Sequence, residues 1–189
     1  MKVLVLDIET NLKHDTIWCC VTQWAGDKGS LLHTEADHLQ AVIDTADVVT
    51  GHNIIGFDGP VLSRVWGIKI PLSKVRDTLV MSRLWNPQLE GGHSLRAWGE
   101  RLGDFKDDFS AFDDGLTQEM IDYCKQDVHV TSLLYDKLTK ELSSFGDSVE
   151  LEHKIAFIMK RQEDNGFKLD VPQAVALLAQ FKDRMSVIT

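Results

Sequence analysis

Hydrophobic positions along the chain follow two patterns, one typical of strands and one typical of helices. Short apolar runs rich in β-branched residues predict strands, and the unbroken run at residues 3–6 is typical of a strand buried on both faces. The predicted strands are residues 2–9, 17–25, 31–34 and 48–50. The first three follow one another with turn chemistry at residues 26–30, so we expect them to form an antiparallel meander.

Apolar residues recur at helical spacing over much of the remaining chain. The predicted helices are residues 35–46, 60–66, 77–85, 94–102, 117–142, 149–165 and 172–185. Ser94 is predicted as an N-cap, Thr117 as a helix start and Gly166 as a helix end. Residues 104–116 hold five aspartates without periodicity, which indicates a solvated acidic loop. The pattern as a whole predicts an α/β protein.

Composition narrows the class of protein. Of the 189 residues, 43% are hydrophobic and 26% are charged, which is ordinary for a globular chain with one core, or one core and an appendage. The net charge of −9 argues against a basic protein that binds duplex non-specifically. It does not exclude a nuclease, because metal-binding carboxylates are negative until their cations neutralise them.

Cysteine usage and hydropathy indicate a reducing compartment. The three cysteines form no CxxC motif, and Cys19 and Cys20 are adjacent in a predicted strand, so their side chains should point to opposite faces. We expect free, buried thiols and neither a disulfide framework nor a zinc site. No apolar stretch approaches the roughly 18 residues of a membrane span, and no signal peptide precedes the first strand. We therefore expect a cytoplasmic protein with no membrane partner.

The first strand delivers two carboxylates, Asp7 and Glu9. In a strand, residues two apart point to the same face, so these like charges should lie side by side at the end of a buried element. Such a pair repels itself and loses hydration, and a cation between the two groups removes both costs. Hard divalent ions prefer carboxylate oxygens, which makes the pair a candidate seat for Mg²⁺ or Mn²⁺. The ordinary alternative is one residue at a strand end and one in a solvated loop.

Three later residues become informative only when they are considered together with this pair. Asp58 follows the strand at 48–50 and stands at the mouth of the next helix, where a carboxylate is common for structural reasons. Tyr123 and Asp127 are four residues apart in the longest predicted helix, which puts phenol and carboxylate on one helix face. Alone, each has an ordinary structural explanation. Together they give the order D-x-E, then N-x3-F-D starting at Asn53, then Y-x3-D.

This set closely resembles the three Exo motifs of the DEDD 3′–5′ exonuclease superfamily. The histidine subclass places a histidine five positions before the last aspartate, where this chain has Asp122; the tyrosine subclass fits Tyr123, four positions before it. The likeness runs over nearly the whole chain and is greatest to the proofreading domains of phage family A DNA polymerases, in the podophage group that recruits thioredoxin. Matching segments are residues 53–66, 77–84, 95–103, 122–128 and 151–170.

The resemblance implies a fold and a domain division. It implies a ribonuclease H-like mixed five-stranded sheet flanked by helices, with a C-terminal helical extension. Residues 1–148 would form the exonuclease domain, and residues 149–189 would resemble the start of a polymerase half. The chain would then be a truncated polymerase, a split subunit or a standalone exonuclease, with a piece of or a partner for a polymerase preferred. Thioredoxin binding is not expected, because the family's docking loop lies outside this sequence.

The resemblance also implies the site residues. Asp7, Glu9, Asp58 and Asp127 would hold two divalent ions, Mg²⁺ or Mn²⁺, about 4 Å apart. Asp7 would contact both ions, Glu9 and Asp127 would complete the site that carries the attacking water, and Asp58 would serve the second site. Tyr123 would orient the nucleophile, since a phenol is a poor base near neutral pH.

The substrate implied is the 3′ end of single-stranded DNA, from which nucleoside 5′-monophosphates are released. Thr10 and Asn53 are candidates for holding the terminal nucleotide, and Leu12 for a wedge against the terminal bases. Two alternatives stay open. The same acids would serve RNA or short oligonucleotides, because the 2′-hydroxyl contact is not legible in the sequence. A non-catalytic single-strand-binding module of this fold is the other, although the presence of all four acids and the tyrosine argues against it.

Overall fold

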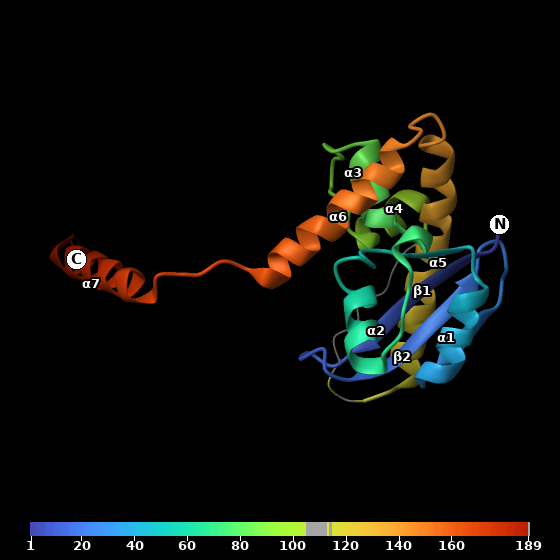
Figure 1. Cartoon of the computed structure of the whole chain (residues 1–189), viewed down its shortest axis with the longest axis horizontal. Helices are drawn as coiled ribbons and strands as arrows, with labels where there is room; N and C mark the ends of the chain where they lie inside the picture. The colour runs from blue at the N-terminus through green and yellow to red at the C-terminus, as the bar shows by residue number, and fades with distance from the viewer. Residues whose placement is uncertain (105–112, 114, 189) are drawn as a thin grey trace. The chain divides into compact units, whose positions relative to one another are not determined.

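A mixed sheet of five strands, in the order β3-β2-β1-β4-β5, forms the centre of the computed structural model, which describes residues 1–104, 113 and 115–188 (Figure 1). The strands are β1 Val3–Thr10, β2 Ile17–Trp24, β3 Ser30–His33, β4 Val48–Gly51 and β5 Val75–Asp77. The first three form the predicted antiparallel meander, while β4 runs parallel to β1 and β5 runs parallel to β4.

Helices account for most of the remaining described residues. They are α1 Ala36–Thr45, α2 Asp58–Trp66, α3 Thr78–Trp85, α4 Leu95–Leu102, α5 Gln118–Glu141, α6 Ser148–Asn165 and α7 Val171–Ile188. The predicted N-caps are confirmed: Ser94 Oγ accepts from the N–H of Ala97, and Thr117 Oγ1 accepts from the N–H of Met120. These caps fix where α4 and α5 begin, because they satisfy N–H groups that lack a partner within the helix.

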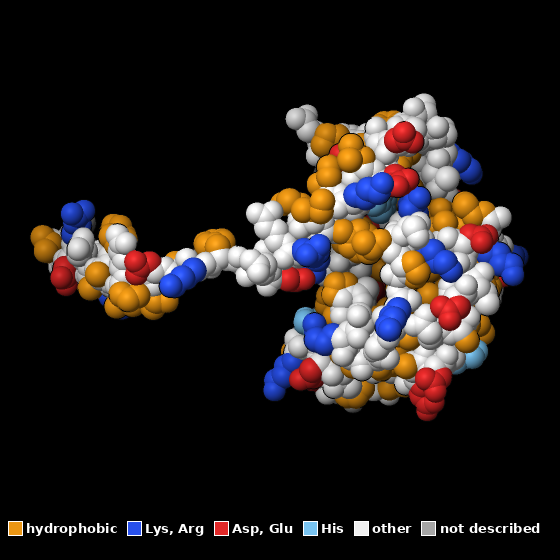
Figure 2. All heavy atoms as spheres, viewed as in Figure 1, with side chains coloured by type: hydrophobic (Ala, Val, Ile, Leu, Met, Phe, Trp, Pro, Cys, Tyr) orange, Lys and Arg blue, Asp and Glu red, His pale blue; other side chains and the backbone are white. Residues whose placement is uncertain are grey.

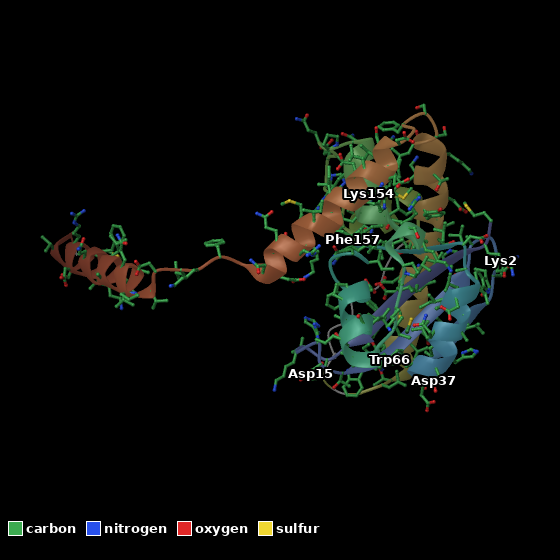
Figure 3. All side chains as sticks on the ribbon, viewed as in Figure 1. Lys2, Asp15, Asp37, Trp66, Lys154 and Phe157 are labelled. Carbon is green, nitrogen blue, oxygen red and sulfur yellow. The ribbon has the colours of Figure 1, made fainter. Side chains whose placement is uncertain are left out.

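The central strand β1 is buried from both sides. Leu4, Leu6 and Ile8 belong to a core with α1 and α2, against which Phe157 of α6 is partly buried (Figure 3). Val5, on the opposite face, packs with residues of α5, which lies behind the strands when α1 and α2 are in front (Figure 1). The prediction of a strand buried on both faces is therefore confirmed. A strand with one face in solvent would alternate apolar and polar residues, and this run does not.

The fifth strand corrects the sequence-based boundaries. The helix predicted over residues 77–85 begins one residue later, and Asp77 is both the last residue of β5 and the N-cap of α3. The sequence pattern predicted no strand here, because β5 has three residues and follows the single 3₁₀ turn Leu72–Lys74. So short a strand shows no alternation, and it is defined by its pairing with β4.

Two further predictions concern the acidic loop and the domain division. The acidic loop predicted over residues 104–116 falls mostly on residues 105–112 and 114, which lie outside the described part of the chain. The chain divides into compact units at Met1–Ile158 and Met159–Thr189. The first ten or so residues of α6 thus belong with the sheet, whereas the assignment of residues 149–189 to a polymerase-related segment stays a prediction.

The second unit carries many exposed apolar side chains. On α7 these are Val171, Val175, Leu177, Leu178, Phe181, Met185 and Val187, and Figure 2 shows hydrophobic side chains along this helix. Among the described residues, no helix combines the length and the apolar character that crossing a bilayer requires.

Candidate active site

The end of β1 brings the predicted acid pair together. Glu9 is buried and Asp7 is partly buried. One ligand atom from each, together with Sγ of Cys124 on α5, lies within 4.8 Å of the other two. The i, i+2 spacing therefore places both carboxylates on the face of the sheet that α5 covers, as the sequence predicted.

Cys124 is the neighbour that sequence reasoning missed. Its thiol donates to the backbone oxygen and to Oδ2 of Asp7, both at 3.5 Å. Burial raises the pKa of this thiol well above its ordinary value, and the charges of Asp7 and Glu9 raise it further. The thiol therefore stays protonated and orients the Asp7 carboxylate as a donor. The signal was its position three residues before Asp127, which puts both on one helix face.

Asp58 is the first residue of α2 and is buried. Burial, together with the charges of Asp77 and Asp127, raises the pKa of Asp58 from its ordinary 3.8 to about 7, against the lowering effect of backbone N–H groups. Asp58 and Asp127 are thus close enough to repel each other. Cys20 connects this group with the first pair, because the charges of both Asp58 and Asp7 raise the pKa of its thiol.

The long helix α5 supplies the remaining predicted side chains. Asp127 is buried and Tyr123 is partly buried one turn earlier on the same face. The helix packs against β1 and β2 through Cys124 and Val128. This packing fixes the rotation of α5, so that its polar turn meets the end of β1.

A tight loop between β4 and α2 leads to Asp58. Asn53 has a left-handed backbone conformation, with φ 66°, which asparagine tolerates better than most residues. The Asp77 carboxylate accepts hydrogen bonds from the N–H groups of Asn53 at 2.9 Å and Ile55 at 3.0 Å. Gly56 lies against Asn53, since a Cβ at this glycine would come within 2.4 Å of Asn53 Oδ1. Asp77 was read from the sequence only as part of a helix.

The predicted substrate contacts lie around this edge in different environments. Thr10 is buried beyond a register shift between Glu9 and Thr10, and its hydroxyl lies 2.9 Å from Nδ1 of His14. Leu12 is 65% exposed, and its N–H donates to the carboxylate of Asp113. Asn53 is exposed. Their contacts with a nucleotide stay predictions.

The donor chemistry of this cluster fits a hard divalent cation. Carboxylate oxygens dominate it, and burial keeps the thiols of Cys20 and Cys124 protonated. A buried Asp58 whose pKa reaches about 7 marks a place where negative charge lacks compensation. A divalent ion supplies that compensation and prefers oxygen ligands. Asp7, Glu9, Asp58 and Asp127 are therefore the residues that could hold Mg²⁺ or Mn²⁺.

The fold and the acidic cluster at the end of its central strand define an α/β domain of the nuclease type. The family model described as 3′–5′ exonuclease matches residues 7–143, and the chain belongs to this family. The DNA-directed DNA polymerase of Enterobacteria phage T3 is 28% identical over 85% of this chain, and that of Escherichia phage T7 is 28% identical over 79%. The match covers only 30% of the length of each phage polymerase.

Solved structures confirm the fold class. NrnC of Brucella melitensis with bound Mg²⁺ superposes with a TM-score of 0.68 at 21% identity, covering 89% of each chain. The same protein bound to pGG gives 0.70 at 20% identity, covering 89% of this chain and 88% of that one. The catalytic core of RRP6 from Trypanosoma brucei gives 0.62 at 15% identity, covering 85% of this chain and 46% of that one. The predicted ribonuclease H-like sheet flanked by helices is therefore correct.

Proposed function

We propose that this domain removes nucleoside 5′-monophosphates from the 3′ end of single-stranded DNA with the aid of two divalent ions, Mg²⁺ or Mn²⁺. The observation that carries the proposal is the pairing of Asp7 and Glu9 on β1, with Cys124 of α5 within 4.8 Å, in a chain of the 3′–5′ exonuclease family. The buried Asp58 of α2, whose pKa responds to the charge of Asp127 on α5, adds to the same negative region. Such a group of like charges is costly to fold unless cations join it.

The chain's own residues take distinct roles in this proposal. Asp7, Glu9 and Asp127 would hold one ion, and Asp58 with Asp7 would hold the other. When bound, the ions would supply an activated water and neutralise charge on the reacting phosphate. Cys124 keeps the Asp7 carboxylate oriented by hydrogen bonding to it. The phenol of Tyr123 orients the attacking water by a hydrogen bond, one turn before Asp127 on α5.

The substrate strand enters unpaired and is gripped at few points. Asn53 is exposed beside the loop that leads to Asp58, and we assign it to the terminal nucleotide together with Thr10. Leu12 projects an exposed apolar side chain suited to wedging against the terminal bases. With a net charge of −9, little affinity comes from a basic surface, which favours a short contact over a few nucleotides.

We infer the partner of this domain and its location in the cell from the phage proteins that match it. The phage proteins that match this chain are DNA polymerases of which it spans 30%. We therefore propose that the domain works beside a polymerase domain or subunit, as a proofreading activity, in the cytoplasm of the host cell. Thioredoxin is not a proposed partner.

A second candidate substrate is a short oligonucleotide. The observation that favours it is the fold likeness to NrnC bound to pGG, with a TM-score of 0.70 over 89% of this chain. The same carboxylates would serve either substrate, so the length and sugar of the strand must be tested separately.

The test is cleavage of 5′-labelled strands, in which shortening from the 3′ end leaves a labelled ladder. Single-stranded DNA, the same sequence as RNA, and a dinucleotide are compared with Mg²⁺, with Mn²⁺ and with chelator. We expect a ladder from DNA that needs metal and disappears in the Asp7→Ala, Glu9→Ala double variant. Preference for the dinucleotide or for RNA would favour the corresponding alternative.

A matched control separates chemistry from loss of acidic residues. Glu35 and Asp37 are also an aspartate and a glutamate two positions apart, and both are exposed, at the start of α1 (Asp37 in Figure 3). The Glu35→Ala, Asp37→Ala variant should degrade DNA like the parent. Equal activity in the Asp7, Glu9 variant would end the assignment, and metal binding without any turnover would favour the non-catalytic binding module.

A further inference from the structure

Asp77 connects three backbone positions through one buried carboxylate. Its Oδ1 accepts from the N–H of Asn53 at 2.9 Å and from that of Leu79 at 2.9 Å, and its Oδ2 accepts from the N–H of Ile55 at 3.0 Å. The side chain is 1% exposed, so water cannot take over these bonds. One residue therefore caps α3 and ties the loop before Asp58 to the end of β5.

This tie sets where the site residues stand. Asn53 adopts φ 66° and Ile55 is buried, so the two bonded N–H groups lie in a loop with little freedom. Asp58 follows Ile55 by only three residues and opens α2. A shift of the loop would move both the Asn53 side chain and the Asp58 carboxylate, whereas the acids of β1 and α5 would stay in place.

His153 of α6 holds Asp77 in turn. Its Nε2 lies 2.7 Å from the backbone nitrogen of Asp77, which can only donate, and its Nδ1 lies 2.6 Å from the carbonyl oxygen of Val149, which can only accept. These partners fix one neutral tautomer, with the proton on Nδ1. A protonated imidazole could not accept the Asp77 N–H.

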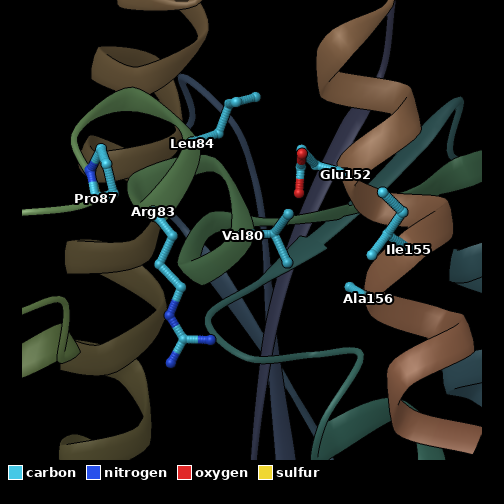
Figure 4. A pocket seen from close by; sticks show the side chains of 7 residues that line it. All are labelled: Val80, Arg83, Leu84, Pro87, Glu152, Ile155 and Ala156. Carbon is cyan, nitrogen blue, oxygen red and sulfur yellow. The ribbon is translucent and has the colours of Figure 1, made fainter. Parts of the chain in front are cut away.

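His153 is the most deeply buried side chain of α6, beside Ala156 and Phe157, which are partly buried against the core. Of the residues of α6, all of which are described, His153 alone is buried. Close packing does not complete the contact with α3, because a hollow of about 330 Å³ lies between the two helices (Figure 4). Its lining residues are Val80, Arg83, Leu84, Pro87, Glu152, Ile155 and Ala156. Because the buried residue is polar, its specific contribution to the contact is the hydrogen bond to Asp77.

We propose that Asp77 and His153 are positioning residues, through which the first turns of α6 hold the loop at residues 52–57 in the conformation that presents Asn53 and Asp58 to the substrate end. This inference rests on the proposed function and extends it. It makes the exonuclease site dependent on a helix that lies outside the 7–143 match to the family.

The test compares His153→Leu, which fills the space but cannot accept a hydrogen bond, with His153→Gln, whose amide oxygen can. We expect His153→Leu to lower kcat about 10-fold, the size typical of lost support for metal ligands, and to raise KM several-fold, because the Asn53 side chain moves with the loop. His153→Gln should recover most of that loss. Asp77→Asn, which keeps one of the two carboxylate acceptors, should behave like His153→Leu.

A matched control is His33 of β3, which is equally buried but bonds to Thr22 and His38 and not to the loop. His33→Leu should lower the melting temperature as much as His153→Leu and leave kcat unchanged. The second readout is amide hydrogen exchange at Asn53 and Ile55 in the full chain, which should accelerate at least 10-fold in His153→Leu and stay unchanged in His33→Leu.

The outcomes separate this proposal from the proposed function. If the parent protein degrades no strand, the proposed function fails, and exchange at Asn53 and Ile55 still decides whether His153 holds the loop. Unchanged exchange in His153→Leu would overturn the inference whatever the activity. So would an equal loss of kcat in His33→Leu, because the effect would then be one of stability.

Discussion

The Sγ atom of Cys124 lies 3.5 Å from Oδ2 of Asp7, at the point where the middle of the sheet meets the long helix. The thiol is buried and its pKa is raised by that burial, so it acts as a hydrogen-bond donor to the carboxylate. A carboxylate that holds a cation needs such partners to fix its orientation. The relationship ties α5 to β1 by chemistry as well as by packing.

Replacing Cys124 tests that role. Cys124→Ser keeps a donor of similar size, and we expect nuclease activity within about threefold of the parent. Cys124→Val fills the space but cannot donate, and the loss of orientation at Asp7 should lower kcat about 10-fold. Steady-state kinetics on single-stranded DNA measures both. A serine variant as impaired as the valine variant would show that the hydrogen bond is not what matters.

The raised pKa of Asp58 predicts how metal ions affect stability at different pH. In the metal-free protein this pKa is about 7 against an ordinary 3.8, so between these values the folded state binds more protons than the unfolded state. Folding stability is therefore lost as pH rises through that window. A divalent ion replaces the proton, and the Mg²⁺-induced rise in melting temperature should be larger at about pH 8 than at about pH 5.5.

The Asp58→Asn variant gives the opposite signature. Because the amide carries no charge, the metal-free variant should melt at a higher temperature than the metal-free parent at about pH 8. Added Mg²⁺ should raise its melting temperature less than it raises that of the parent. Asp47→Asn, an exposed aspartate at the other end of the sheet that accepts from the N–H of Lys2, serves as the control and should respond like the parent.

The lowered pKa of His33 predicts a second effect of pH on folding stability, opposite in sign to that of Asp58. Burial and the nearby charge of His38 together lower the pKa of His33 from 6.5 to about 4. Between these values the unfolded state binds the extra proton, so stability is lost as pH falls from about 6.5 towards about 4.

Urea unfolding at several pH values measures this effect. The parent should lose stability steeply below about pH 6.5, and His33→Gln should show a shallower slope. His153 also has a lowered pKa through burial, and its contribution should remain in the variant. An unchanged slope in His33→Gln would contradict the assigned cause.

Much of the fold was predictable because burial leaves a pattern in the sequence. The run at residues 3–6 has no polar position, and the structure covers that strand on both faces. Helix starts at Ser94 and Thr117 were predictable because capping is local chemistry. On α5, however, helical spacing alone does not decide which neighbouring apolar residue is buried: Leu133 is 37% exposed, while Leu134 and Val130 are buried. Leu133 and Leu134 are adjacent, and in a helix with 3.6 residues per turn two adjacent side chains cannot both face the sheet.

The residues that support the site could not be predicted from the sequence, for a different reason. The acids of the three motifs are recognisable because their spacing within each element is fixed. Cys124 and Asp77 act on partners 117 and 24 residues away, so only the folded chain brings them together. His153 acts across 76 residues on a strand too short to predict. Long-range hydrogen bonds of this kind have no periodic signature in the sequence.

Gly56 offers a steric test of the assignment of Asn53 to the substrate end. A methyl group at Gly56 would come within 2.4 Å of Asn53 Oδ1, which is the far end of an exposed side chain and can turn away. Gly56→Ala should therefore displace the Asn53 amide and leave the fold intact, raising KM for single-stranded DNA several-fold with little change in melting temperature. Gly29→Ala is the matched control, because a Cβ there meets nothing within 4 Å. If Gly56→Ala binds and degrades DNA like the control, Asn53 does not contact the terminal nucleotide. A double variant adds a second check. If Asn53→Ala and Gly56→Ala raise KM equally and the double variant raises it no further, both substitutions act through the same amide.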